Sequence, residues 1–357
     1  MAKARPVRGA TVNRESTRFS LPERQADGDW LDDREGIDGE PPPLKTTVTV
    51  ERPRTIITRN QSPDVPFDRS INPYRGCEHG CIYCFARPTH AYHDLSPGLD
   101  FESKLFAKPD AAMLLRAELA KRGYVCRPIA FGTNTDPYQP IESDWRITRS
   151  CIELLAECNH PITITTKSDR VTRDLDLLGP MAAKGLAAVM VSVTSLDPKV
   201  ARTVEPRAPH PERRLAAVAK LAAAGVPTVV SIAPVIPAIT DHEMEHLIAR
   251  AAEAGAYGAG FIPVRLPFEV APLFEAWLDA HFPDRKAKVM ATIGSIRDGR
   301  RNDPEFFTRM SGSGPWAELL RTRFQIACRK HGLNRERKPL RTDLFRPPPG
   351  PQGELFG

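Results

Sequence analysis

The sequence predicts an α/β fold built on a parallel sheet, and the pattern of apolar residues along the chain indicates it. Short apolar runs alternate with amphipathic segments from about residue 70 to residue 265. This alternation is typical of repeated strand-helix units. The 357 residues can bury a large core, and length alone fits one large domain with tails or two smaller domains.

The expected elements follow one another as six strand-helix units. A first strand is expected near residues 70–74, and strand-like runs follow at 129–132, 162–165, 188–193, 228–232 and 259–264. Helical segments are expected over 111–122, 145–157, 172–183, 212–224 and 242–254. Six units make a partial (β/α)6 barrel that is TIM-like but incomplete. Additional C-terminal helices are expected at about 272–296 and at 316–331.

Composition indicates where the expected domains begin and end. The first 50 or so residues mix charged residues and proline with few apolar residues, so they cannot bury enough surface to offset chain entropy. The last residues, with the run 347–351 rich in proline, have the same character. We therefore expect a mostly disordered segment at 1–55, a core domain at 56–270, a helical extension at 271–334 and a flexible tail at 335–357.

Charge and hydropathy exclude some classes of protein. The formal charge of +6 and the pI near 9.0 are compatible with a polyanionic partner, although many enzymes share that balance. No apolar stretch approaches the ~20 residues of a membrane helix. The first residues lack the apolar core of a secretory signal. We expect a soluble cytoplasmic protein without membrane partners, in a compartment where reduced thiols can hold iron.

The most informative motif is a group of three cysteines, Cys77, Cys81 and Cys84. Their Cys-x3-Cys-x2-Cys spacing places three soft thiolates on one tight loop, close enough to hold three corners of a cubic iron-sulfur cluster. The fourth iron would have no ligand from this loop. An open iron of this kind can bind a small molecule and deliver an electron to it.

Two other readings of these cysteines compete. Tetrahedral zinc accepts three cysteines with His79 or His90 as the fourth ligand, but structural zinc usually takes its ligands from two short pairs separated by a spacer. Disulfides fit less well, because seven is an odd number of cysteines and the chain shows no secretory signal.

With Tyr83 before the last cysteine and Phe85 after it, the motif resembles that of the radical S-adenosylmethionine (radical SAM) superfamily. The resemblance implies a 4Fe-4S cluster whose open iron chelates the amino and carboxylate groups of S-adenosylmethionine. It also implies an external electron donor and reductive cleavage of the sulfonium to a 5'-deoxyadenosyl radical. The expected core domain at 56–270 would then be a radical SAM domain, and its six-stranded partial barrel is similar to that of the superfamily.

Other runs narrow the resemblance to the spore photoproduct lyase relatives, which include DNA repair photolyase-like radical proteins. They are Arg75-Gly76-Cys77, residues 133–136, Thr166-Lys167-Ser168, Glu205-Pro206-Arg207 and residues 234–237. The resemblance covers roughly residues 65–265, and only the cysteine loop is strongly specific. By this likeness Thr135, Lys167 and Ser192 would contact S-adenosylmethionine.

The candidate binding residues follow the strands of the predicted barrel, where chemistry gathers in such folds. Asp136 could clamp the methionine amino group or the ribose, or simply form a turn that caps the next helix. Lys167 could offer its charge to the methionine carboxylate, or lie in solvent as an ordinary lysine. The hydroxyl of Ser192 could complete the cradle, although serine also commonly ends strands.

One position departs from the lyase pattern. The lyase has a cysteine at the start of the stretch after strand two, and that cysteine returns a hydrogen atom to the repaired thymine; this chain has Thr133. A threonine O–H bond is far too strong to donate a hydrogen atom readily, so thymine-dimer reversal by that route is not expected. Tyr138, close after the same strand, is a candidate substitute carrier of the radical.

The leading hypothesis is a radical SAM enzyme acting on nucleic acid, with DNA repair as the nearest analogy. The alternatives are the same chemistry on RNA, a protein or a small metabolite, and a non-catalytic iron-sulfur protein that binds DNA. Five side chains could contact bases, although arginines near strand ends also pair with carboxylates: Arg87, Tyr92, Arg207, Arg265 and Phe268.

The end of the chain carries a second candidate interaction. Gln352, Leu355 and Phe356 form a Gln-x-x-Leu-Phe pattern that resembles the peptide by which bacterial DNA enzymes dock on the sliding clamp. In such a peptide an amide anchors one end and two apolar side chains fill a pocket, and a flexible arm can present it at little structural cost.

Overall fold

The computed structural model of the chain describes residues 8–14, 16, 18, 45–336 and 339–349. Its strands are β1 (Thr47–Val50), β2 (Ile57–Arg59), β3 (Arg69–Ile71), β4 (Tyr74–Arg75), β5 (Lys104–Ala107), β6 (Ile129–Phe131), β7 (Ile162–Thr166), β8 (Ala187–Ser192), β9 (Thr228–Val235) and β10 (Gly258–Pro263). Its α-helices are α2 (Asp100–Ser103), α3 (Ala111–Leu119), α4 (Glu142–Trp145), α5 (Ile147–Glu157), α6 (Leu175–Ala183), α7 (Pro198–Val204), α8 (Pro211–Ala223), α9 (Met244–Glu253), α10 (Val270–His281), α11 (Pro283–Ser295), α12 (Thr308–Ser311) and α13 (Gly314–Lys330). Short 3-10 helices are η1 (Arg87–His93), η2 (Asp169–Asp174) and η3 (Asp241–Glu243).

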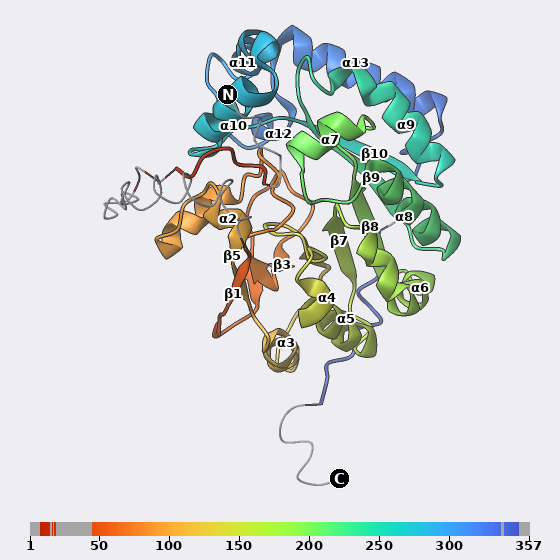
Figure 1. The fold of residues 1–357 in the computed structure, drawn as a ribbon. Coiled ribbons are helices and arrows are strands. Elements are labelled where there is room, and N and C mark those ends of the chain that lie inside the picture. The colour runs from red at the N-terminus through yellow and green to blue at the C-terminus, as the bar shows by residue number, and fades with distance from the viewer. Residues whose placement is uncertain (1–7, 15, 17, 19–44, 337–338, 350–357) are drawn as a thin grey trace.

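The main sheet has seven strands in the order β10-β9-β8-β7-β6-β3-β2. Its six strands from β3 to β10 are parallel and neighbour one another in chain order, while β2 pairs antiparallel with β3 at one edge. Helices α6, α8 and α9 pack on β8 and β9 from outside, as Figure 1 shows. This arrangement confirms the predicted α/β fold with six strand-helix units of a partial barrel.

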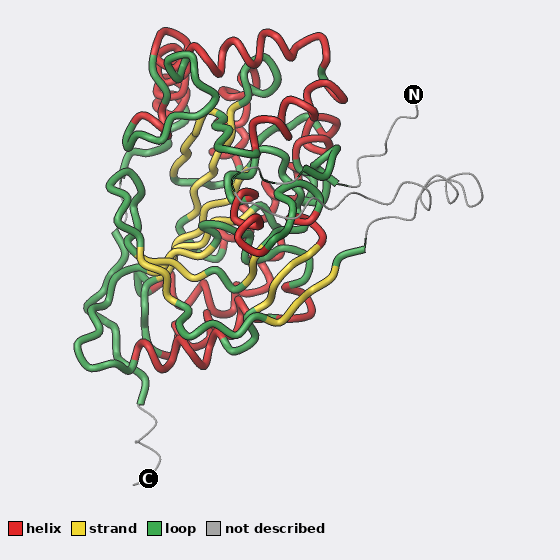
Figure 2. The backbone as a smooth tube through the Cα atoms, turned by 90° about the vertical axis from the view of Figure 1, so that its left-hand side faces the viewer, coloured by secondary structure: helices red, strands yellow, loops and turns green. Residues whose placement is uncertain are grey.

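Alternating burial along the strands explains why these residues form a sheet with two different faces. In β7 the side chains of Ile162, Ile164 and Thr166 are buried, and the two threonines between them are only partly covered. Successive side chains point to opposite faces of a strand, so this pattern fixes which face of β7 meets the core. Figure 2 shows the strands running through the interior of the molecule, with helices and loops around them.

A second, three-stranded sheet was not expected from the sequence. Its order is β1-β5-β4, with β1 parallel and β4 antiparallel to β5. Because β4 immediately follows β3 and precedes the three cysteines, this small sheet supports the start of their loop. The strands have two to four residues each, too short to produce a recognisable period in the sequence.

The predicted terminal segments are partly described. Within 1–55, strand β1 and residues 8–14 lie against the rest of the molecule, and most of the remainder lies outside the described residues. Within 335–357, residues 339–349 run along the core: the Arg346 amide donates to the Cys158 carbonyl at 2.9 Å, and Phe345 packs on Tyr124 and His160. Gln352, Leu355 and Phe356 lie outside the described residues.

None of the helices in the described part of the chain combines the length and apolar character that a membrane crossing requires.

Candidate active site

The cysteine loop, residues 76–84, follows β3 and β4 at the carboxyl end of the parallel strands. Gly76 and Gly80 both have left-handed backbones, with φ of 71° and 68°. A Cβ on Gly76 would lie 2.7 Å from Leu105 Cδ2, and one on Gly80 would lie 2.8 Å from Glu102 Oε2. Both positions therefore require glycine, which lets the chain coil tightly enough to bring its three cysteines together.

Hydrogen bonds from distant residues hold the cysteine loop. The side chain of Gln139 donates to the Gly76 carbonyl at 3.1 Å and accepts from the Glu78 amide at 3.0 Å. The amide of Cys77 donates to the Phe101 carbonyl at 3.0 Å, and that of Ile82 to the Val204 carbonyl at 3.1 Å. The loop is thus anchored on both sides before any ligand binds.

A buried ion pair also supports the cysteine loop. The Arg87 guanidinium donates to the carbonyls of Cys81 at 2.9 Å and Gly80 at 3.2 Å, and it pairs with the fully buried Glu102. The Glu102 carboxylate also accepts the amides of Gly9 at 2.9 Å and Ala10 at 2.8 Å. Residues 8–14, which we name the strap, are therefore tied to the cysteine loop through Glu102.

We expect Glu102→Gln to loosen both the strap and the cysteine loop. The substitution preserves shape but leaves the buried Arg87 charge without its partner, a change that costs about 3–5 kcal/mol. The measurements are the thermal unfolding midpoint and iron per chain after anaerobic reconstitution, both of which should fall. Glu157→Gln, which removes an exposed pair with Arg116, is the matched control and should leave both unchanged. Wild-type values for Glu102→Gln would contradict this role.

The three thiols have the chemistry expected of iron ligands. All are free cysteines, with Cys77 and Cys81 buried and Cys84 partly exposed. Burial raises the pKa of Cys77 well above its usual value and that of Cys81 to about 12, although the Lys167 charge opposes the shift at Cys81. Buried thiols of this kind become thiolates when a metal supplies the compensating charge. The donor set therefore fits an iron-sulfur cluster.

The two histidines considered as zinc ligands have other partners. His79 Nδ1 lies 3.3 Å from Asp136 Oδ2, and His90 Nε2 hydrogen-bonds the Lys104 carbonyl at 2.9 Å. Across the described ranges, no group of three or more His, Cys, Asp or Glu side chains is placed around one metal position. The thiolates of a cubic cluster each bind a different iron, so they need not converge on one point.

Asp136 connects the loops that follow β3, β6 and β7. Its carboxylate accepts from Thr166 Oγ1 at 2.6 Å, from the Lys167 amide at 2.7 Å and from the Tyr138 amide at 2.9 Å. Burial alone would raise its pKa, but His79 and these donors lower it to about 2. Asp136 is therefore an ionised structural link beside the cysteine loop, and its contact with S-adenosylmethionine stays a prediction.

Lys167 and Ser192 present polar groups that the protein leaves available. Within the described part of the chain no hydrogen bond reaches Lys167 Nζ, which lies 5.7 Å from the Tyr83 ring centroid. Burial lowers the pKa of Lys167, but the nearby Cys81, Glu205 and Asp136 together raise it by more than burial lowers it. The ammonium therefore stays charged. Ser192 ends β8, and its hydroxyl likewise has no partner among those residues. Both could bind a small polar ligand.

The side chains of the remaining predicted residues form hydrogen bonds with other groups of the protein. Thr135 is buried and its hydroxyl donates to the Tyr74 carbonyl at 3.1 Å. Tyr138 is fully buried, and its hydroxyl donates to Asp174 at 3.0 Å, in η2. Thr133 Oγ1 accepts from the side-chain Nδ2 of Asn72, directly after β3, at 3.0 Å. The role of Tyr138 as a radical carrier and the contact of Thr135 with the cofactor stay predictions.

Sequence reasoning did not assign a role to Glu205, which is fully buried beside the cysteine loop. Tyr83 and Thr194 donate their hydroxyls to its carboxylate, and Arg214 pairs with its other oxygen. Burial would raise the pKa of Glu205, but Arg214 and Lys167 lower it to about 2. This network fixes the side chain of Tyr83, which lies between Cys81 and Cys84 in the sequence. The only signal in the sequence was the run Glu205-Pro206-Arg207.

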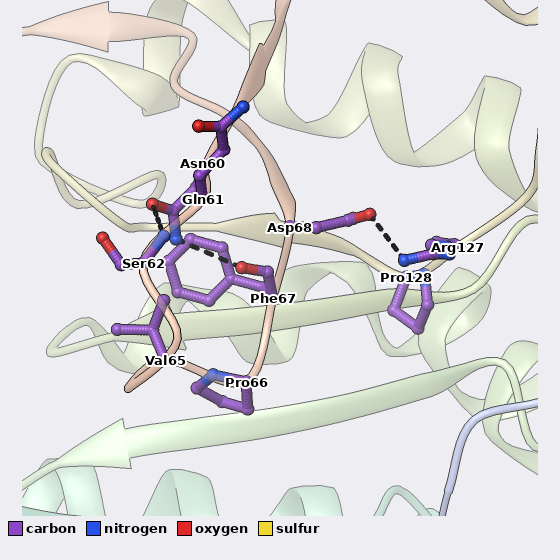
Figure 3. A pocket seen from close by; sticks show the side chains of 9 residues that line it. All are labelled: Asn60, Gln61, Ser62, Val65, Pro66, Phe67, Asp68, Arg127 and Pro128. Carbon is purple, nitrogen blue, oxygen red and sulfur yellow. Dashed lines mark hydrogen bonds and ion pairs between the residues drawn. The ribbon is translucent and has the colours of Figure 1, made fainter. Parts of the chain in front are cut away.

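A separate pocket lies at the opposite end of the strands. It is formed by residues 60–62 and 65–68 of the β2–β3 connection with Arg127 and Pro128, as Figure 3 shows. Asp68 and Pro128 directly precede β3 and β6, whereas the cysteine loop follows β3. Because catalytic groups of such folds gather at the carboxyl ends of the strands, this pocket is not part of the candidate site.

Comparison with known proteins gives this geometry a family context. The family model of the radical SAM superfamily matches residues 71–251. An uncharacterised protein of Mycobacterium tuberculosis is 38% identical over 277 residues, which cover 77% of this chain and 78% of that protein. A radical SAM Nalpha-GlyT isomerase of Pseudomonas phage M6 is 24% identical over 51% of this chain and 36% of its own length.

A solved structure shares the fold. Spore photoproduct lyase complexed with dinucleoside spore photoproduct superimposes with a TM-score of 0.57 over 89% of this chain and 86% of that chain, at 16% identity.

Proposed function

The chain belongs to the radical SAM superfamily, and we propose that it cleaves S-adenosylmethionine reductively at a 4Fe-4S cluster held by Cys77, Cys81 and Cys84. The single observation that carries the proposal is the cysteine loop, which places three free thiols at the carboxyl end of β3. When bound, the cluster would pass one electron from an external donor to S-adenosylmethionine. That electron would break the C5'–S bond and give methionine and a 5'-deoxyadenosyl radical.

The protein's own groups bind and orient the cofactor in this proposal. The Lys167 ammonium pairs with the methionine carboxylate, because it is charged and has no hydrogen-bond partner within the described chain. The Ser192 hydroxyl donates to the same ligand from the end of β8. Asp136 holds the Lys167 backbone through its 2.7 Å hydrogen bond, which keeps the ammonium beside the cysteine loop.

We propose that the substrate is a nucleic acid. The fold shared with spore photoproduct lyase, a protein solved with a dinucleoside photoproduct, supports this class, and the positive net charge of +6 is compatible with it. Because Thr133 carries no thiol, this position cannot return a hydrogen atom to the substrate as the lyase cysteine does. Reversal of a thymine dimer by that route is therefore not proposed. The substrate radical must be resolved by another hydrogen source or by rearrangement.

The decisive experiment is anaerobic reconstitution with iron and sulfide, reduction with dithionite and quantification of 5'-deoxyadenosine. We expect iron with acid-labile sulfide and formation of 5'-deoxyadenosine. An intact cluster without that product would favour the non-catalytic iron-sulfur protein, and zinc without sulfide would exclude the cluster. Adding damaged or undamaged DNA and following deuterium between substrate and 5'-deoxyadenosine tests the substrate class; DNA-independent turnover with no deuterium exchange would contradict it.

A further inference from the structure

Five aromatic side chains are exposed among the described residues, and they come from the segments around the cysteine loop, the end of β10 and the start of α12. They are Phe85 (44% exposed), Tyr92 (68%), Phe268 (64%), Phe306 (48%) and Phe307 (65%). Phe85 follows the last cysteine, and Tyr92 belongs to η1, directly after the loop. Phe268 follows β10, and Phe306 and Phe307 precede α12, which packs on that strand. We name this group the aromatic band.

Arginine side chains are interleaved with these rings. The Arg265 guanidinium lies 4.9 Å from the Phe85 ring centroid. Arg18 lies 4.5 Å from the ring of Phe268 and 5.9 Å from that of Tyr92. The Arg309 guanidinium lies 4.8 Å from the Phe306 ring centroid. Large exposed rings are costly in water, so a gathering of them with cations indicates a surface that binds a partner.

Of the arginines in this group, Arg265 differs in having no carboxylate as an ion-pair partner among the described residues. Arg18 pairs with Glu269 and Arg309 with Asp64, whereas Arg265 has neither an ion pair nor a hydrogen bond within the described ranges. Burial and the neighbouring Arg309 lower the pKa of Arg265, and Cys84 and Asp64 act in the opposite direction. A half-covered guanidinium without a partner, next to the cysteine loop, is suited to an external anion.

The band stands on a rigid frame. The buried Arg297 donates to the Val264 carbonyl at 3.0 Å and to the Arg309 carbonyl at 3.1 Å, which fixes the end of β10 relative to α12. Asp64, in the connection between β2 and β3, pairs with Arg309 and so links the two edges of the open sheet. The arginines and rings are therefore positioned before a ligand arrives, which reduces the entropic cost of binding.

We propose that the aromatic band and Arg265 bind single-stranded nucleic acid or nucleotides extruded from a duplex, with bases stacked on Tyr92 and Phe268 and a phosphate on Arg265. This rests on the proposed function and specifies how its substrate is presented. Base pairs inside a duplex are covered by their neighbours, so only unpaired bases can stack on exposed rings. Stacking of this kind tolerates any sequence, and the arginines supply backbone contacts.

The test measures binding of a fluorescent single-stranded DNA by anisotropy, with the reconstituted full-length protein. Phe268→Asn removes a ring while tolerating the left-handed backbone at φ 49°, and Tyr92→Ala removes the other. Each should weaken binding about tenfold. Arg265→Gln should weaken it and lower the slope of log Kd against log salt by about 0.7, the value for one phosphate contact on a single strand. Exposed residues outside the band provide controls, Arg122→Gln for charge and Leu319→Ala for apolar surface.

Tighter binding of single strands than of matched duplex, lost in the band variants and kept in both controls, supports the proposal. Equal binding of single strand and duplex overturns it, as does a salt slope that Arg265→Gln leaves unchanged. Preference for an acidic peptide over DNA overturns it in favour of a protein partner. Unfolding midpoints exclude misfolding, and 5'-deoxyadenosine formed without DNA reports separately on the proposed function.

Discussion

Cys81→Ser is expected to reduce iron from about four atoms per chain to near zero and to abolish 5'-deoxyadenosine formation. Cys81 is the central cysteine of the loop, and its carbonyl is held by Arg87, so the backbone should keep its shape while the thiol is lost. A serine hydroxyl at neutral pH is protonated and is a harder donor than a thiolate, which iron-sulfur clusters need. The measurement is iron and sulfide per chain, together with product analysis.

Cys126→Ser is the matched control for this substitution. Cys126 is partly exposed, precedes β6 and lies away from the cysteine loop, so its loss should leave iron and turnover at wild-type levels. If Cys81→Ser kept a full complement of iron and sulfide, the ligand assignment would be wrong. If both variants lost iron equally, the loss would report general instability rather than ligation.

Lys167→Gln should weaken binding of S-adenosylmethionine roughly 10- to 100-fold, the effect of losing one charge-assisted hydrogen bond. Its ammonium is charged beside the cysteine loop and has no hydrogen-bond partner in the described part of the chain, so the substitution breaks little within the protein. The measurement is equilibrium binding to the oxidised, reconstituted protein, which separates affinity from chemistry. Iron content should remain at the wild-type level.

Lys199→Gln is the control for the lost charge, because Lys199 is exposed at the start of α7 and its side chain forms no ion pair in the described structure. It should bind S-adenosylmethionine as tightly as the wild type. Lys167→Arg restores the charge but not the compact ammonium and should recover part of the affinity. Wild-type affinity in Lys167→Gln would remove Lys167 from the site.

Local sequence patterns predict some elements of this fold closely and miss others. The strands β6 to β10 were predicted within about two residues at most ends, because each is a short apolar run between polar turns. The predicted helix over 172–183 is instead divided into η2 and α6, and the helix expected at 242–254 begins with η3. Strand β1 and the strap escaped prediction, since neither has a long apolar period.

The sequence by itself determined the fold class and the position of the three-cysteine loop, because strand periodicity and the spacing of three thiols on one loop are properties of neighbouring residues. Only the tertiary structure decided which polar groups support that loop. Glu102 meets residues more than 90 positions away in the strap, and Glu205 meets Tyr83 across 122 positions. Such buried pairs exist because burial makes an unpaired charge costly, and the partner is chosen by the path of the chain rather than by any local pattern.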